Sequence, residues 1–123
     1  METNVTDRIK SYEDACKELG ITPIDESVLL ASGFTKDEIV YRKIKTISEA
    51  LNEGWKADWI NEKEKKWIPY FYPASASGFV FTGTYYRYLC AYAGDGARLC
   101  FKTAALAEYA GRQFTELYKE FIM

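Results

Sequence analysis

The sequence predicts an α+β fold in which N-terminal helices precede a three- to four-stranded antiparallel sheet, a meander, and a C-terminal amphipathic helix packs on that sheet. Three observations support this. Apolar residues recur at helical spacing up to position 53, aromatic and β-branched residues alternate from position 67, and helical spacing returns after position 103. The 123 residues, 48% of them hydrophobic, are enough to bury a core. With no internal repeat, we expect a single domain over residues 1–123.

The first helix is expected to begin at Ser11, because a serine hydroxyl caps free amides and Asp14 follows three residues later. It should end at Gly20. Residues 25–30 are expected to form a further helical turn.

A longer helix is expected over residues 36–53, opened by a capping box of Thr35 and Glu38 and closed by Gly54 in a left-handed conformation. Its apolar residues have the i, i+4, i+7, i+11 spacing of a buried face. They are Val40, Ile44, Ile47 and Leu51. Residues 55–66 change character and are expected to form a loop with an exposed tip, in which the charged run 62–66 is solvated.

Four strands are expected, because aromatic and β-branched residues dominate the region that follows. They span residues 67–71, 78–82, 85–92 and 97–102, joined by turns at 73–77, at Gly83-Thr84 and at 94–96. Pro69 restricts the first strand to an edge. On the fourth strand, Leu99 and Phe101 share one face. The other face carries Arg98, Cys100 and Lys102 and is expected to meet solvent at least at its ends.

The chain is expected to close with a helix over residues 104–121, capped by Thr103. Its apolar stripe repeats at intervals of 4, 4, 3 and 4 residues and should lie across the sheet. The stripe consists of Leu106, Ala110, Phe114, Leu117 and Phe121.

Charge and composition restrict the function classes. The net charge of −2 disfavours nucleic-acid binding by bulk electrostatics. The absence of histidine excludes catalytic triads and metal sites that need this residue. We expect no catalytic residues, no metal and no cofactor, and therefore no enzyme; a hydrolase that works through carboxylates alone is a minor alternative. No apolar run approaches a membrane span. Three dispersed cysteines without a CxxC pair predict free, buried thiols in a cytoplasmic protein.

The aromatic residues are the feature that points to a binding site, since they make up 16% of the chain. Tyrosine and tryptophan combine an apolar ring with a polar edge, which suits ligand stacking and protein interfaces, and an arginine adds a cation. The candidate binding residues are Trp55, Trp59, Trp67, Tyr70, Tyr86, Arg87, Tyr88 and Arg98. The alternative is that these rings pack the sheet and core. A recognition surface requires a solvent-exposed tryptophan beside Arg87 or Arg98.

Four stretches of sequence also carry a resemblance: ALNEGWKADW, WIPYF, GFVF and RLCFKTAALAEYAGRQFTELYKEF. Together they are similar to a family of small uncharacterised proteins encoded by gut anaerobic bacteria and by their phages and mobile elements. The likeness runs from about residue 11 to the C-terminus. It implies a phage or mobile-element context, supplies no catalytic residues and favours a partner-binding role, including interference with host defence.

Two functions are therefore expected. The first is a non-enzymatic, phage- or mobile-element-related accessory module that binds a protein partner or associates with itself as a homo-oligomer. The second is a protein that binds or sequesters a small molecule or nucleotide, which it stacks on the aromatic cluster and neutralises with Arg87 or Arg98.

Overall fold

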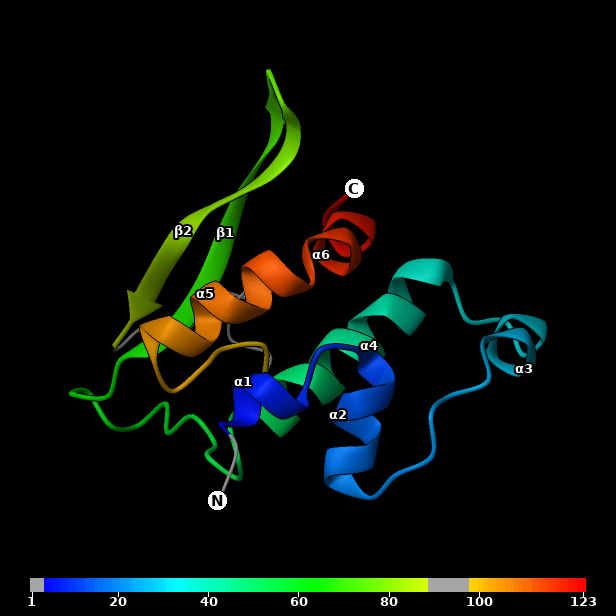
Figure 1. Ribbon diagram of the computed structural model, residues 1–123, viewed down its shortest axis with the longest axis horizontal. Coiled ribbons are helices and arrows are strands. Elements are labelled where there is room, and N and C mark those ends of the chain that lie inside the picture. The colour runs from blue at the N-terminus through cyan, green and yellow to red at the C-terminus, as the bar shows by residue number, and fades with distance from the viewer. Residues whose placement is uncertain (1–3, 89–97) are drawn as a thin grey trace.

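The computed structural model describes residues 4–88 and 98–123, and this part of the chain has an α+β fold with one two-stranded antiparallel sheet. The elements, in chain order, are α1 (Val5–Arg8), α2 (Tyr12–Leu19), α3 (Glu26–Ala31), α4 (Lys36–Leu51), β1 (Lys66–Ser75), β2 (Gly78–Arg87), α5 (Ala104–Gln113) and α6 (Thr115–Ile122). Helices α1, α2 and α4 gather at one end, and the hairpin of β1 and β2 projects from the other, with α5 and α6 between them (Figure 1).

The N-terminal helices form largely as predicted. The Ser11 hydroxyl accepts the Asp14 N–H at 3.1 Å, and Gly20 closes α2 with a φ of 69°. The short helix α1 was not predicted, because four residues are too few to show a periodicity. Its Val5, and Ile9 just after it, are buried against the same core as α2.

Helix α4 is the longest of the helices that gather at one end of the fold. The predicted capping box is present, and in it the Glu38 carboxylate accepts the backbone N–H of Thr35 at 3.0 Å. The Thr35 hydroxyl also donates to this carboxylate, at 2.8 Å. The predicted buried face is confirmed: Val40, Ile44, Ile47 and Leu51 are each at most 2% exposed. The helix ends at Leu51, two residues early, because Glu53 and Gly54 both have positive φ, at 49° and 91°.

The hairpin corrects the predicted strands. Residues 78–82 and 85–87 belong to one continuous strand, so the expected turn at Gly83-Thr84 is wrong: Gly83 pairs with Tyr70 and Thr84 with Pro69. Phe81 then pairs with Phe71, so a bulge at this point leaves one extra residue on β2. The bulge lets a strand that contains glycine continue through the position that looked like a turn.

The expected first strand is also longer than predicted. It runs through Pro73 to Ser75, so the turn comprises only residues 76–77 and is followed by Gly78 with a φ of 86°. Residues 89–92 of the third expected strand and the turn at 94–96 lie outside the described residues. A third or fourth strand is not confirmed.

The last expected strand, 97–102, contributes only an isolated bridge in the part that is described. Phe101 and Trp67 exchange backbone hydrogen bonds at 3.0 and 2.7 Å. Leu99 and Phe101 are buried as expected, and Cys100 is a buried free thiol, as predicted, at 2% exposure. Both sides of the segment are covered at residues 99–101, since it runs there between α4 and the base of the hairpin rather than along a sheet, whereas Arg98 is exposed.

The C-terminal helix is broken into two at Phe114, where φ is −113° and ψ is 30°. The Thr115 hydroxyl donates to the carbonyl oxygens of Gly111 and Arg112, at 2.7 and 3.0 Å, and this side-chain competition for helix carbonyls accounts for the break. Thr103 caps α5 as predicted, accepting the Leu106 N–H at 3.1 Å.

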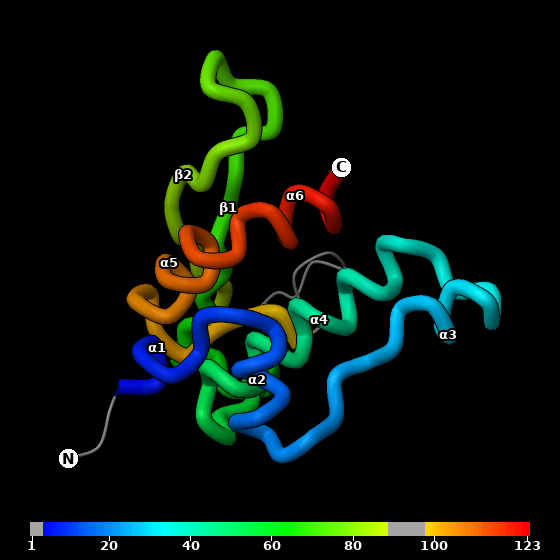
Figure 2. The backbone as a smooth tube through the Cα atoms, turned by 45° about the vertical axis from the view of Figure 1, so that its right-hand side comes forward, coloured from blue at the N-terminus to red at the C-terminus, as the bar shows by residue number. Residues whose placement is uncertain are grey.

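The two helices cover one face of the hairpin, as a helix-on-sheet fold requires (Figure 2). The predicted residues Leu106, Ala110 and Phe114 are buried. Beyond the break, Tyr118 is buried at 6% exposure, and the predicted Leu117 and Phe121 are only partly buried. No helix in residues 4–88 or 98–123 is both long and apolar enough to cross a bilayer.

Candidate functional site

The structure separates the predicted binding residues into two groups. Trp55, Trp59 and Arg98 line one pocket. The other group, Trp67, Tyr70, Tyr86, Arg87 and Tyr88, lies on or just after the hairpin strands. The single aromatic surface expected from the sequence is therefore two surfaces.

The pocket lies between α4, the loop that follows it and the segment at residues 98–100. Its volume is about 480 Å³, within the usual range for small-molecule sites. The lining residues are Lys45, Glu49, Asn52, Trp55, Lys56, Ala57, Trp59, Arg98 and Cys100. Of these, Lys45, Lys56 and Arg98 are cationic and exposed.

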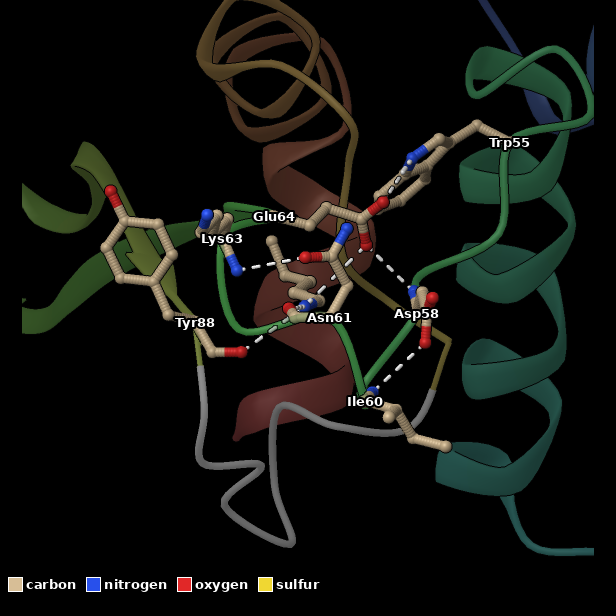
Figure 3. A network of polar contacts seen from close by, with 8 residues as sticks. Trp55, Asp58, Ile60, Asn61, Lys63, Glu64 and Tyr88 are labelled. Carbon is tan, nitrogen blue, oxygen red and sulfur yellow. Dashed lines mark hydrogen bonds and ion pairs between the residues drawn. The ribbon is translucent and has the colours of Figure 1, made fainter.

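A carboxylate behind the pocket holds the loop in place. Glu64 accepts the indole N–H of Trp55 at 3.3 Å and the backbone N–H of Asp58 at 2.8 Å (Figure 3). Two further Asx-type turns close the loop, in which Asp58 accepts the Ile60 N–H and Asn61 accepts the Lys63 N–H, each at 3.0 Å. The tip is exposed as predicted, with Ile60 at 91%.

Lys66 is the largest fully buried side chain of the described residues, which corrects the expectation that the run 62–66 is solvated. Its ammonium donates to the carbonyl oxygens of Asn61 and Tyr88, at 2.9 and 3.2 Å, and lies 3.7 Å from a carboxylate oxygen of Glu64. It also lies 5.2 Å from the centre of the Trp59 ring. A single buried cation thus joins the loop to the end of β2. The burial of Lys66 is tolerated because its ammonium has hydrogen-bond and ion-pair partners.

Asn52 closes the pocket from the side of α4. Its amide donates to the Cys100 carbonyl at 2.9 Å, and its side-chain oxygen accepts the Lys102 N–H at 3.0 Å. Asn52 is 4% exposed, so this pair of bonds is buried and fixes the segment that carries Arg98 against the helix. The side chain is occupied with the backbone and is structural.

One face of the hairpin carries rings that pack the fold. Trp67 and its cross-strand neighbour Tyr86 have ring centres 4.9 Å apart, with the Lys65 ammonium above both rings at 5.6 and 4.7 Å. Tyr86 also meets Tyr88 edge-on at 5.1 Å. Trp67 packs against the core and is half-buried. Trp67, Tyr86 and Tyr88 therefore fit the alternative that the predicted rings pack the sheet and core.

The opposite face of the hairpin carries exposed rings. Tyr70, Tyr72 and Tyr85 are 41%, 60% and 54% exposed. The register places Tyr70 across from Gly83 and places Tyr85 two pairs further along the same face. The Arg87 guanidinium lies 4.8 Å from the centre of the Tyr85 ring. Only Tyr70 and Arg87 of this group were predicted.

The solvent exposure of the tryptophans, which a recognition surface requires, is intermediate. All three tryptophans are half-buried, and Trp55 and Trp59 share the pocket with Arg98. The sequence analysis missed Lys45, Glu49 and Lys56. Lys45 and Glu49 are one helical turn apart and Asn52 follows at the next, so their i, i+4, i+7 spacing just before Trp55 was a usable signal.

The comparisons with known proteins give no relative: no family model matches the chain, and neither the curated proteins nor the solved structures contain a significant match. In residues 4–88 and 98–123 no three cysteine, aspartate or glutamate side chains are grouped so as to hold a metal ion.

Proposed function

We propose that the protein is a non-enzymatic protein-binding module and that its contact surface is the outer face of the hairpin. The observation that supports this is the row of exposed tyrosines Tyr70, Tyr72 and Tyr85 on the face away from α5 and α6. Large rings with a polar edge are enriched at protein interfaces and lose little entropy when they are bound. We call these three residues the tyrosine face.

The position of the hairpin also supports the proposal. Its tip projects away from the helices, so a partner can approach the strands from outside (Figure 2). In the described part of the chain, the backbone of the hairpin pairs outside itself only where Trp67 meets Phe101. Among the described residues, both strand edges beyond that bridge present donors and acceptors to which an extended segment of a partner can add.

Arg87 extends the tyrosine face at the end of β2. Its guanidinium lies over the Tyr85 ring at 4.8 Å. Tyrosine and arginine are both enriched among the residues that anchor protein interfaces. The partner we propose therefore presents apolar groups that pack against these side chains, and a second copy of this chain is one such partner.

The proposed context is that of a phage- or mobile-element-related accessory protein, including one that interferes with host defence. The support for this is the sequence resemblance described above.

The test combines oligomeric state and partner mapping. Light scattering after size exclusion measures self-association, and cross-linking followed by mass spectrometry maps a partner onto the chain. We expect Tyr72→Ser with Tyr85→Ser to abolish the association and to leave the free energy of unfolding within about 1 kcal/mol, as exposed substitutions do. Ile122→Ser, at a side chain that is 48% exposed on α6, is the control. Cross-links that avoid the hairpin, or an association that survives the double substitution, would refute the proposal.

A further inference from the structure

The pocket beside α4 collects positive charge that the fold does not use. Lys45, Lys56 and Arg98 line it with one carboxylate, Glu49, and within residues 4–88 and 98–123 none of these four side chains forms an ion pair. The local charge is therefore +2 in a protein whose net charge is −2. Cations gathered in a concave site raise the local concentration of anions.

The two tryptophans of the pocket are held before any ligand arrives. The Trp55 indole N–H is already bonded to Glu64, and the Trp59 ring lies beside the buried ammonium of Lys66. What Trp55 offers a ligand is therefore its ring and not its N–H. Rings that are fixed in this way stack on a planar molecule with little further loss of entropy.

Arg98 is held in a conformation that arginine does not favour. Its φ is 69°, in the left-handed region, and its side chain is exposed. A residue other than glycine in this region costs of order 1 kcal/mol or more, and such strain concentrates at functional sites. Burial does not offset the cost, since the residue is exposed where it lines the pocket.

We propose that this pocket binds a planar aromatic anion of about the size of a mononucleotide, stacked against Trp55 and Trp59 and neutralised by Lys45, Lys56 and Arg98. The volume of about 480 Å³ accommodates one such molecule. The phosphate or carboxylate of the ligand supplies the negative charge that the three cations lack. This site is separate from the tyrosine face, so each proposal fails or stands alone.

Titration calorimetry with the full chain tests the ligand class. The probes are AMP, GMP and UMP, with adenosine and inorganic phosphate as the compounds that supply only the ring or only the charge. We expect at least one nucleotide to bind at least about tenfold more tightly than both, as expected for a charge-assisted contact added to stacking. The affinity should fall as salt rises, because exposed cations are screened. Absence of binding by every nucleotide, or equal binding of phosphate alone, would overturn the proposal.

Substitutions locate the site. Lys45→Gln and Arg98→Gly should each weaken the nucleotide at least about tenfold. Arg98→Gly relieves the backbone strain, so a loss of binding by this variant cannot be attributed to unfolding. Lys119→Gln, an exposed lysine on α6, is the matched control and should bind as the original protein does. Nucleotide binding that is unchanged by both pocket substitutions would place the ligand elsewhere and refute the assignment. Tyr72→Ser should leave nucleotide binding unchanged.

Discussion

Gly111 of α5 lies directly against the Phe81 ring of β2, so closely that a Cβ added to the glycine would overlap two atoms of the ring. The same Cβ would lie 2.9 Å from the Cβ of Pro69 on β1. The helix therefore meets the hairpin through the one residue type that has no side chain. This contact explains why a glycine, which weakens a helix, is placed in the last turn of α5.

The first prediction is that Gly111→Ala destabilises the protein by about 1–3 kcal/mol, the usual cost of forcing an extra group into a packed contact. The higher helix propensity of alanine opposes this loss by up to about 1 kcal/mol. Chemical denaturation gives the free energy of unfolding. In a double-mutant cycle with Phe81→Ala the two losses should not add, because the smaller side chain makes room. A stabilised Gly111→Ala variant would contradict the contact.

The second prediction concerns Phe114, which is 6% exposed at the junction of α5 and α6 and meets the Tyr109 ring at 6.4 Å. Phe114→Ala should lower the free energy of unfolding by about 3–5 kcal/mol, since the cavity lies between two helices that cannot both move inward. Ile122→Ala, at a side chain that is 48% exposed, should change it by less than about 0.5 kcal/mol. A loss below about 1 kcal/mol for Phe114→Ala would argue against the observed packing.

The parts of the fold that follow from local patterns were predictable. The spacing of Val40, Ile44, Ile47 and Leu51 predicts the buried face of α4. The pair Thr35 and Glu38 predicts where the helix begins. Caps and periodicities depend on residues within one or two turns of each other. The sequence alone therefore contains the information they need.

The strands were less predictable, because Gly83-Thr84 has the composition of a turn. In the structure the Tyr70 ring lies over Gly83, 3.1 Å from the position of an added Cβ. The glycine is thus needed for a ring on the neighbouring strand. Whether a glycine makes a turn or makes room depends on the pairing register, which is a tertiary property.

The candidate site was predictable only in part. Trp55, Trp59 and Arg98 were expected to act together, but nothing local shows that Asn52 binds the backbone on either side of Phe101 and so brings Arg98 to α4. The burial of Lys66 was missed for a similar reason. Its carbonyl partners belong to Asn61 and Tyr88, and the second is 22 residues away in the chain.

The third prediction is a pH effect at α3, which contains no buried residue and is tied to α4 by Glu26. A hydrogen bond of 3.1 Å from Lys43, together with Lys36 at 3.7 Å, lowers the pKa of the Glu26 carboxyl below its usual range. Because the folded pKa is depressed, the contribution is complete above the unfolded pKa of about 4.3 and is lost as the pH falls through the folded value.

We therefore expect α3 to loosen below about pH 4 before the core is affected, since the core does not depend on this ion pair. NMR relaxation of the α3 amides from pH 7 to pH 3 measures the change. Glu26→Gln should show the loosened state at pH 7, and Glu120→Gln, exposed on α6, should not. The effect should be small, because Glu26 is 39% exposed and solvent screens the pair. An α3 that is equally ordered at both ends of the range would contradict the prediction.

The fourth prediction concerns the buried ammonium of Lys66. It donates hydrogen bonds to the carbonyl oxygens of Asn61 and Tyr88 and forms an ion pair with Glu64. Lys66→Met keeps most of the length and apolar volume of the side chain but leaves two carbonyl oxygens without their donor. A fully buried polar group left without a partner costs about 1–3 kcal/mol. Asn61 is exposed and Tyr88 is half-buried, so water can replace part of the lost donation and the two oxygens together should cost about this much. Glu64 is 23% exposed and can be hydrated, so it adds less than a fully buried partner would.

The expected result is a loss of about 1–3 kcal/mol in the free energy of unfolding for Lys66→Met, with a change in tryptophan fluorescence in the folded state. The fluorescence should change because the ammonium lies 5.2 Å from the centre of the Trp59 ring and pairs with the carboxylate that holds Trp55. Lys63→Met, three residues earlier at an exposed position of the same loop, is the matched control and should do neither. If Lys66→Met unfolds at the same denaturant concentration as the original protein and its fluorescence is unchanged, the ammonium does not join the loop to β2. Loss of stability with unchanged fluorescence would mean that the two tryptophans are held by the backbone turns of the loop instead.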